Sequence, residues 1–123
     1  MWIMLNDAMF SIVEDRNDKT AVVVRARRKG DIEKVFTKFK DKVIESSNSD
    51  YRFRIFADRQ LVSELIANEV MRIDYDNFKN SVGDRQLRSA YGNIWTVLYD
   101  VQEKNHPRDS NWWLDYASPS RYK

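Results

Sequence analysis

The segment YRFRIF at residues 51–56 constrains the fold more than any other stretch, because apolar and arginine side chains alternate strictly along it. Successive side chains of a β-strand point to opposite faces of a sheet. We therefore expect Tyr51, Phe53 and Ile55 to face helices in a core, and Arg52 and Arg54 to lie on the opposite, open face.

Three apolar segments before it also indicate strands. Trp2–Leu5 and Met9–Glu14 form either a hairpin or one strand broken by a bulge, and both alternatives stay open. Residues 20–28 are rich in β-branched side chains and predict a strand that ends at Gly30. Alternation along this strand places Val22, Val24 and Ala26 on one face, and Val23, Arg25 and Arg27 on the other.

Helical spacing of apolar residues dominates the chain after these strands. One helix is predicted over residues 31–44 with Asp31 as its N-cap, and a second begins at Asp58. The longest amphipathic helix is expected over residues 84–104. The segment DYDN at 74–77 begins like a calcium loop, but it lacks the later ligands and the glycine of that loop, so we expect Asp74 or Asp76 to cap a further helix.

This order, β-β-(β)-α-β-α-α-α, predicts an α+β protein with a small antiparallel sheet of three or four strands and helices packed on one face. The length of 123 residues suits a single domain over residues 1–104, followed by an extended C-terminal tail over residues 105–123. The tail is rich in aromatic residues, which is unusual for a disordered segment. It either folds back onto the domain or supplies partner anchors through Trp112, Trp113 and Tyr116.

Several function classes are disfavoured by what the sequence lacks. There is no cysteine and a single histidine, His106, so nucleophilic catalysis and structural zinc have few residues to draw on. The three glycines are isolated, so no phosphate-binding glycine loop is present. We expect no catalytic residues, no cofactor, no metal site and no enzyme activity. No run reaches the ~18 apolar residues of a membrane span, so we expect a soluble, cytoplasmic protein without a membrane partner.

Six basic residues form the candidate binding site. If strands 20–28 and 51–56 are neighbours, four arginines share the open face, and like charges on adjacent strands cost stability unless they are compensated. In one interpretation, nearby acids compensate the arginines; these are Glu14, Asp15 and Asp18, or acids on a neighbouring helix. In the other, the face binds an anionic partner through bidentate hydrogen bonds from the arginine guanidinium groups. Both alternatives stay open. The six residues are Arg25, Arg27, Arg28, Lys29, Arg52 and Arg54.

The chain resembles a family of small uncharacterised proteins found in bacteria and phage genomes. The resemblance covers roughly residues 1–103 and lies in four blocks: VRARRKGDIEKVF (24–36), DYRFR (50–54), IDYDNFK (73–79) and IWTVL (94–98). It implies a compact, single-domain bacterial or phage protein. Because the family has no assigned activity, the resemblance transfers no functional residues.

We therefore expect a non-enzymatic protein that binds an acidic protein surface or a phosphate-bearing ligand through the arginine-rich face. The phage resemblance makes a host- or defence-directed inhibitor, acting in the host cytoplasm, one such role. The alternatives are a nucleotide-sequestering or nucleotide-processing protein and a structural assembly component that forms a homo-oligomer. Nucleic acid is weakly supported as a partner, because the net charge is only +2 and the aromatic pattern of RNA-binding sheets is absent.

Overall fold

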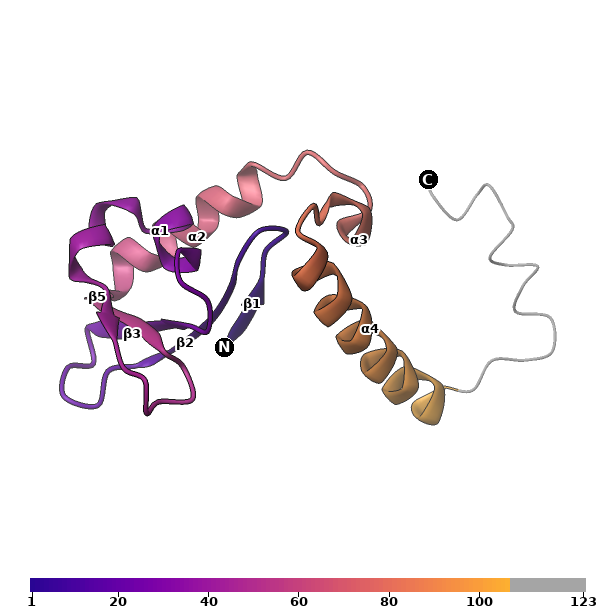
Figure 1. Cartoon of the computed structure of the whole chain (residues 1–123), viewed down its shortest axis with the longest axis horizontal. Helices are drawn as coiled ribbons and strands as arrows, with labels where there is room; N and C mark the ends of the chain where they lie inside the picture. The colour runs from indigo at the N-terminus through magenta and orange to yellow at the C-terminus, as the bar shows by residue number, and fades with distance from the viewer. Residues whose placement is uncertain (107–123) are drawn as a thin grey trace.

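A computed structural model describes residues 1–106 of the chain, which form an α+β fold around a five-stranded antiparallel sheet (Figure 1). The strands are β1 (Trp2–Met4), β2 (Met9–Glu14), β3 (Ala21–Ala26), β4 (Ile44–Glu45) and β5 (Phe53–Asp58), and their order in the sheet is β1-β2-β3-β5-β4. The helices are α1 (Asp31–Val35), the 3-10 helix η1 (Thr37–Lys42), α2 (Arg59–Met71), α3 (Phe78–Ser81) and α4 (Arg85–Asn105). The predicted fold class is confirmed.

The first two strands form a hairpin, which decides between the two alternatives left open by the sequence. Met4 pairs with Met9 in an antiparallel register, and the backbone N–H of Leu5 donates to the carbonyl oxygen of Ala8 across the turn at 2.8 Å. The sheet has one strand more than expected. The additional strand, β4, pairs with β5 at the edge.

The predicted helix over residues 31–44 is wrong in its second half. The α-helix ends at Val35, η1 follows, and β4 begins at Ile44, where pairing with β5 satisfies backbone groups that would otherwise bond within a helix. Its start also differs, because Gly30 is the N-cap, with φ of 94° in the left-handed region that glycine adopts readily. Asp31 is the first helical residue and is 3% exposed.

The cap of α2 is the residue that the sequence predicts, whereas the predicted cap of α3 is wrong. The Asp58 side chain accepts from the N–H of Leu61 at 3.0 Å, and Asp84 caps α4 in the same way. The cap of α3 is Asn77, whose side chain accepts from the N–H of Asn80. The predicted caps of α3, Asp74 and Asp76, lie upstream of this position.

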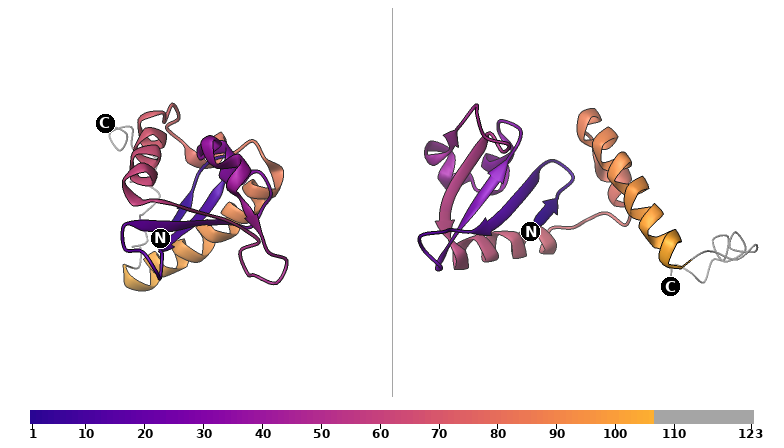
Figure 2. Two further views of the ribbon diagram at one scale, coloured as in Figure 1. Left: turned by 90° about the vertical axis from the view of Figure 1, so that its left-hand side faces the viewer. Right: turned by 90° about the horizontal axis from the view of Figure 1, so that it is seen from below.

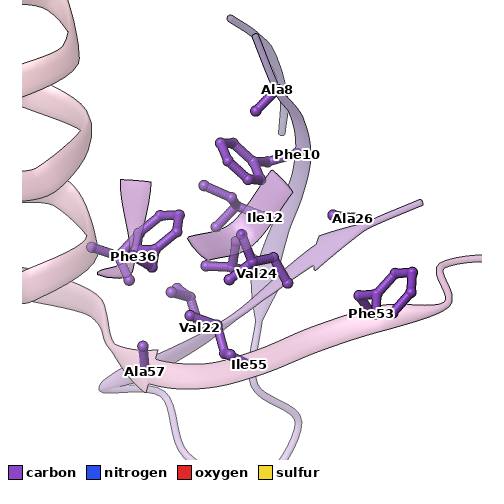
Figure 3. Close-up of a cluster of buried hydrophobic side chains, with 12 residues drawn as sticks. Ala8, Phe10, Ile12, Val22, Val24, Ala26, Phe36, Phe53, Ile55 and Ala57 are labelled. Carbon is purple, nitrogen blue, oxygen red and sulfur yellow. The ribbon is translucent and has the colours of Figure 1, made fainter. Parts of the chain in front are cut away.

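The main core lies between one face of the sheet and the helices α1 and α2 (Figure 3). Phe10 on β2 meets Phe36 at the end of α1 edge to face, with ring centroids 5.5 Å apart. The core contains the apolar residues predicted for β3 and two of the three predicted for β5. Its buried members are Ala8, Phe10, Ile12, Val22, Val24, Ala26, Ile32, Phe36, Phe53, Ile55, Ala57 and Val62.

The helix α4 packs by its N-terminal half only. Leu87 and Tyr91 are buried with Val82 in a second, smaller cluster. The Tyr91 hydroxyl donates to the carbonyl oxygens of Leu5 at 2.9 Å and Ala8 at 3.1 Å, which ties the helix to the β1–β2 turn. Burial, followed by the nearby charge of Asp31, raises the pKa of Tyr91 to about 12, so the hydroxyl stays a donor.

The C-terminal half of α4 stands apart from the sheet (Figure 2). Its side chains Trp95, Leu98 and Val101 are more than half exposed. The packing of α4 ends near Ile94, and its contact with the sheet is through Met9, on the face opposite the main core. Within residues 1–106 no helix combines the length and apolar character needed to cross a membrane.

We predict that Phe36→Ala lowers the free energy of unfolding by about 3–5 kcal/mol, because the ring is 0% exposed and its removal leaves a cavity in the main core. Phe56→Ala is the matched control, since this ring is 50% exposed on the opposite face of the sheet. We expect it to cost about 1 kcal/mol or less. Urea unfolding followed by circular dichroism measures the free energy of unfolding of both variants. Equal losses of stability would contradict the assignment of one sheet face to the core and the other to the surface.

Candidate functional site

The face of the sheet turned away from α1 and α2 carries two arginines side by side. Arg25 on β3 and Arg54 on β5 are directly opposite each other in the antiparallel register, and Ser11 on β2 is opposite Arg25. Residues paired in this way lie on the same face. We call this surface the open face. Its residues, taken from the register, are Trp2, Met4, Met9, Ser11, Val13, Ala21, Val23, Arg25, Ile44, Arg54, Phe56 and Asp58.

Neutral groups hold the guanidinium groups of this pair. Arg25 donates from Nη2 to the Ser11 hydroxyl at 2.7 Å. Arg54 donates from Nη2 to the Ser49 hydroxyl and to the carbonyl oxygen of Tyr51, both in the loop between β4 and β5. The Nε atoms of both arginines are buried and have no hydrogen-bond partner within the described part of the chain. Both cations are thus half-buried, and the groups that accept their hydrogen bonds are uncharged.

Tyr51 lies against two of the predicted site residues. Its ring centroid is 4.2 Å from Cζ of Arg27 and 4.5 Å from Cζ of Arg25, and Arg27 also donates to the carbonyl oxygen of Asp50 at 3.0 Å. The sequence pattern placed Tyr51 in the core with Phe53. Tyr51 is buried, at 6% exposed, but it precedes β5 and lies outside the main core cluster, where its ring packs on Arg25 and Arg27.

Arg28 has a different environment from the other predicted site residues. It contacts the Asp31 carboxylate at 3.1 Å and the Asp84 carboxylate at 2.8 Å. Burial acts to lower the pKa of Arg28, but the hydrogen bonds with Asp31 and Asp84 outweigh it and raise that pKa overall. Its charge is already neutralised within the fold. Lys29 and Arg52, the two remaining residues of the predicted set, are exposed.

The acids that could have compensated the arginines are engaged elsewhere. Glu14 pairs with Arg59 at 2.6 Å. Asp15 accepts from the N–H of Asn17, and Asp18 accepts from Thr20, whose hydroxyl and backbone bonds lower the pKa of Asp18. Over residues 1–106, no carboxylate lies within 4.0 Å of the guanidinium nitrogens of four arginines. These four, which we call the arginine cluster, are Arg25, Arg27, Arg52 and Arg54.

A small cleft separates the arginine cluster from the first turns of α4. It has a volume of about 180 Å³, and Arg27, Tyr51 and Tyr91 line it together with apolar side chains of Met9 and Leu87. Sites for drug-sized ligands usually have about 300–1,000 Å³. The cleft is therefore small for a whole nucleotide, although it leaves one side of Arg27 accessible.

Two aromatic side chains of the open face were not recognised from the sequence. Trp2 is 72% exposed and lies in the same cross-strand row as Arg25 and Arg54. Phe56 is 50% exposed and lies in the adjacent row of the same face. The position of Phe56, two residues after Arg54, could have revealed its face. The face of Trp2 could be assigned only from the pairing of β1 with β2. The predicted anchors Trp112, Trp113 and Tyr116 lie outside the described residues.

Comparisons of this chain with family models, curated proteins and solved structures found no match. Among the described residues, no group of three histidine, aspartate or glutamate side chains could hold a metal ion. The arrangement that remains is a pair of half-buried guanidinium groups flanked by two further arginines. Such groups form bidentate, charge-assisted hydrogen bonds with phosphate or carboxylate.

We predict that Asp84→Ala destabilises the protein at pH 7 more than Asp84→Asn does. Both variants lose the ion pair with Arg28, but asparagine keeps the cap acceptor for the N–H of Leu87. The Leu87 N–H and then Arg28 lower the pKa of Asp84 from its ordinary value of 3.8. A depressed folded-state pKa means that the carboxylate stabilises the fold above pH 3.8 and loses this effect as the pH falls further.

The measurement is urea unfolding of the wild type and both variants between pH 7 and pH 3. We expect the gap between the wild type and Asp84→Asn to narrow below about pH 4. A gap that stayed constant down to pH 3 would show that the ion pair does not contribute.

Proposed function

We propose that this protein is a non-enzymatic binding protein whose open face recognises an anionic group, phosphate or carboxylate, on a partner. One observation carries the proposal. Arg25 and Arg54 are directly opposite each other on neighbouring strands, and the groups that hold them are all neutral.

This arrangement is unfavourable for the protein alone. Like charges opposite each other on adjacent strands destabilise a sheet. Partial burial adds a desolvation cost that dipoles offset only in part, and the two unpaired Nε atoms add to it. An anion placed between the guanidinium groups would remove the repulsion and supply the missing acceptors. Relief of this repulsion and desolvation cost would therefore contribute favourably to the free energy of anion binding.

The neutral contacts also prepare the cluster for a ligand. Ser11, Ser49 and the Tyr51 ring hold the guanidinium groups of Arg25, Arg54 and Arg27 in defined positions. Side chains that are already ordered lose less entropy on binding, whereas each mobile side chain costs about 0.5–1.5 kcal/mol to immobilise. An isolated nucleotide is a weaker candidate ligand, since the nearest cleft has a volume of only about 180 Å³.

We predict that the double variant Arg25→Gln with Arg54→Gln weakens anion binding about tenfold or more, because each hydrogen bond to a charged group contributes about 1.5–3 kcal/mol. Inorganic polyphosphate and poly-L-glutamate are the probes for the phosphate and carboxylate alternatives. Isothermal titration calorimetry in low-salt buffer measures their affinities.

The matched control is Lys38→Gln with Lys40→Gln, which removes the same charge from exposed positions of η1, on the helical side of the sheet. We expect it to change the affinity by about twofold or less, because exposed charges are screened. If both double variants lost the same affinity, the loss would be explained by net charge alone, and the proposal would be overturned. Unchanged binding in the arginine variant would overturn it as well.

A further inference from the structure

The open face combines cations with exposed aromatic rings. Trp2 is in the same cross-strand row as Ser11, Arg25 and Arg54, and Phe56 is two residues from Arg54 on β5. With exposed fractions of 72% and 50%, these rings leave much apolar surface in water. Exposed apolar surface bordered by polar groups is typical of an interaction site. A simple anion would use the arginines and leave these rings without a role.

The spacing of these groups suits a chain-like ligand. Three inter-strand steps separate β1 from β5 in the sheet, which corresponds to about 14 Å at ~4.8 Å per step. Arg25 on β3 lies between the strands of the two rings, and Arg54 is on β5 with Phe56. A stacked nucleic-acid strand advances about 3.4 Å per nucleotide and an extended strand advances more, so a few nucleotides cover this distance.

A second copy of this chain is a poor occupant of the open face. Face-to-face packing of two sheets would bring together the Arg25 and Arg54 guanidinium groups of both copies. Among the open-face residues, the one carboxylate is that of Asp58, which lies four residues from Arg54 on β5 and accepts from the N–H of Leu61 as the cap of α2. Desolvating four like charges without a partner costs far more than the apolar contact would contribute.

We propose that the anionic partner of the open face is single-stranded nucleic acid. This inference rests on the proposed function and names its partner. Phosphates bind to the arginine cluster, and bases stack on Trp2 and Phe56, as bases do on aromatic residues of sheet surfaces. The bases of a duplex are already stacked and paired, so a duplex cannot reach these rings in the same way. The low net charge of +2 does not oppose a local cationic surface of this kind.

The test uses fluorescence anisotropy of the full chain with labelled oligothymidylate and oligouridylate, which serve as DNA and RNA probes. We expect Trp2→Ala and Phe56→Ala each to weaken binding about five- to hundredfold, the range corresponding to loss of one base–aromatic stack. The matched control is Trp95→Ala, because Trp95 is 57% exposed and lies on α4 instead of a strand of the sheet. It should bind as the wild type does. An unlabelled DNA duplex should compete poorly.

Polyphosphate separates the failure of this inference from the failure of the proposed function. We expect Trp2→Ala and Phe56→Ala to bind polyphosphate normally, because it has no bases to stack. If the arginine variant loses polyphosphate or polyglutamate binding while the aromatic variants bind oligonucleotide like the wild type, the nucleic-acid inference is wrong and the anion-binding proposal stands. If the arginine variant retains binding to every probe, both are wrong. Circular dichroism of each variant confirms that the fold is intact.

Discussion

The ion pairs of Arg28 with Asp31 and Asp84 connect three parts of the fold. Arg28 follows β3, Asp31 opens α1, and Asp84 caps α4. The buried Asp31 carboxylate also accepts from the backbone N–H of Met9 at 3.3 Å, which adds β2 to the network. Removing one partner of a buried pair leaves an uncompensated charge, so the network is costly to break. It fixes the start of α4 beside Met9, at one end of the open face.

Arginine thus has two different roles on neighbouring residues of one segment. Arg28 has two carboxylates and is fully engaged in the fold. Arg25, three residues earlier, has a serine hydroxyl and the face of Tyr51. A hydroxyl and an aromatic ring orient a guanidinium group without neutralising it. The difference between the two environments is the physical reason for assigning a structural role to one arginine and a binding role to the other.

The sequence predicted the faces of β3 and β5 well, because alternation within a strand depends only on the backbone. It failed where the outcome depended on contacts between distant segments. The helix after Asp31 ends early because Ile44 pairs with β5, and Tyr51 packs on Arg25 and Arg27 instead of joining the main core cluster with Phe53. The arginine pair at the centre of the site also needed the register between β3 and β5, which a shift of one residue would have changed. Asp31 could not be distinguished from a helix cap without knowing its partners.

The low net charge bears on how such a face would achieve specificity. A protein that neutralises Z phosphates of a single strand loses affinity with salt at a slope of about −0.7Z, and the arginine cluster can engage only a few phosphates. Its electrostatic attraction is therefore modest and short-ranged, unlike that of a strongly basic protein. Stacking on Trp2 and Phe56 does not depend on charge and is less sensitive to salt. Binding that combines few phosphate contacts with two stacks would select unpaired bases and discriminate against other polyanions at physiological ionic strength.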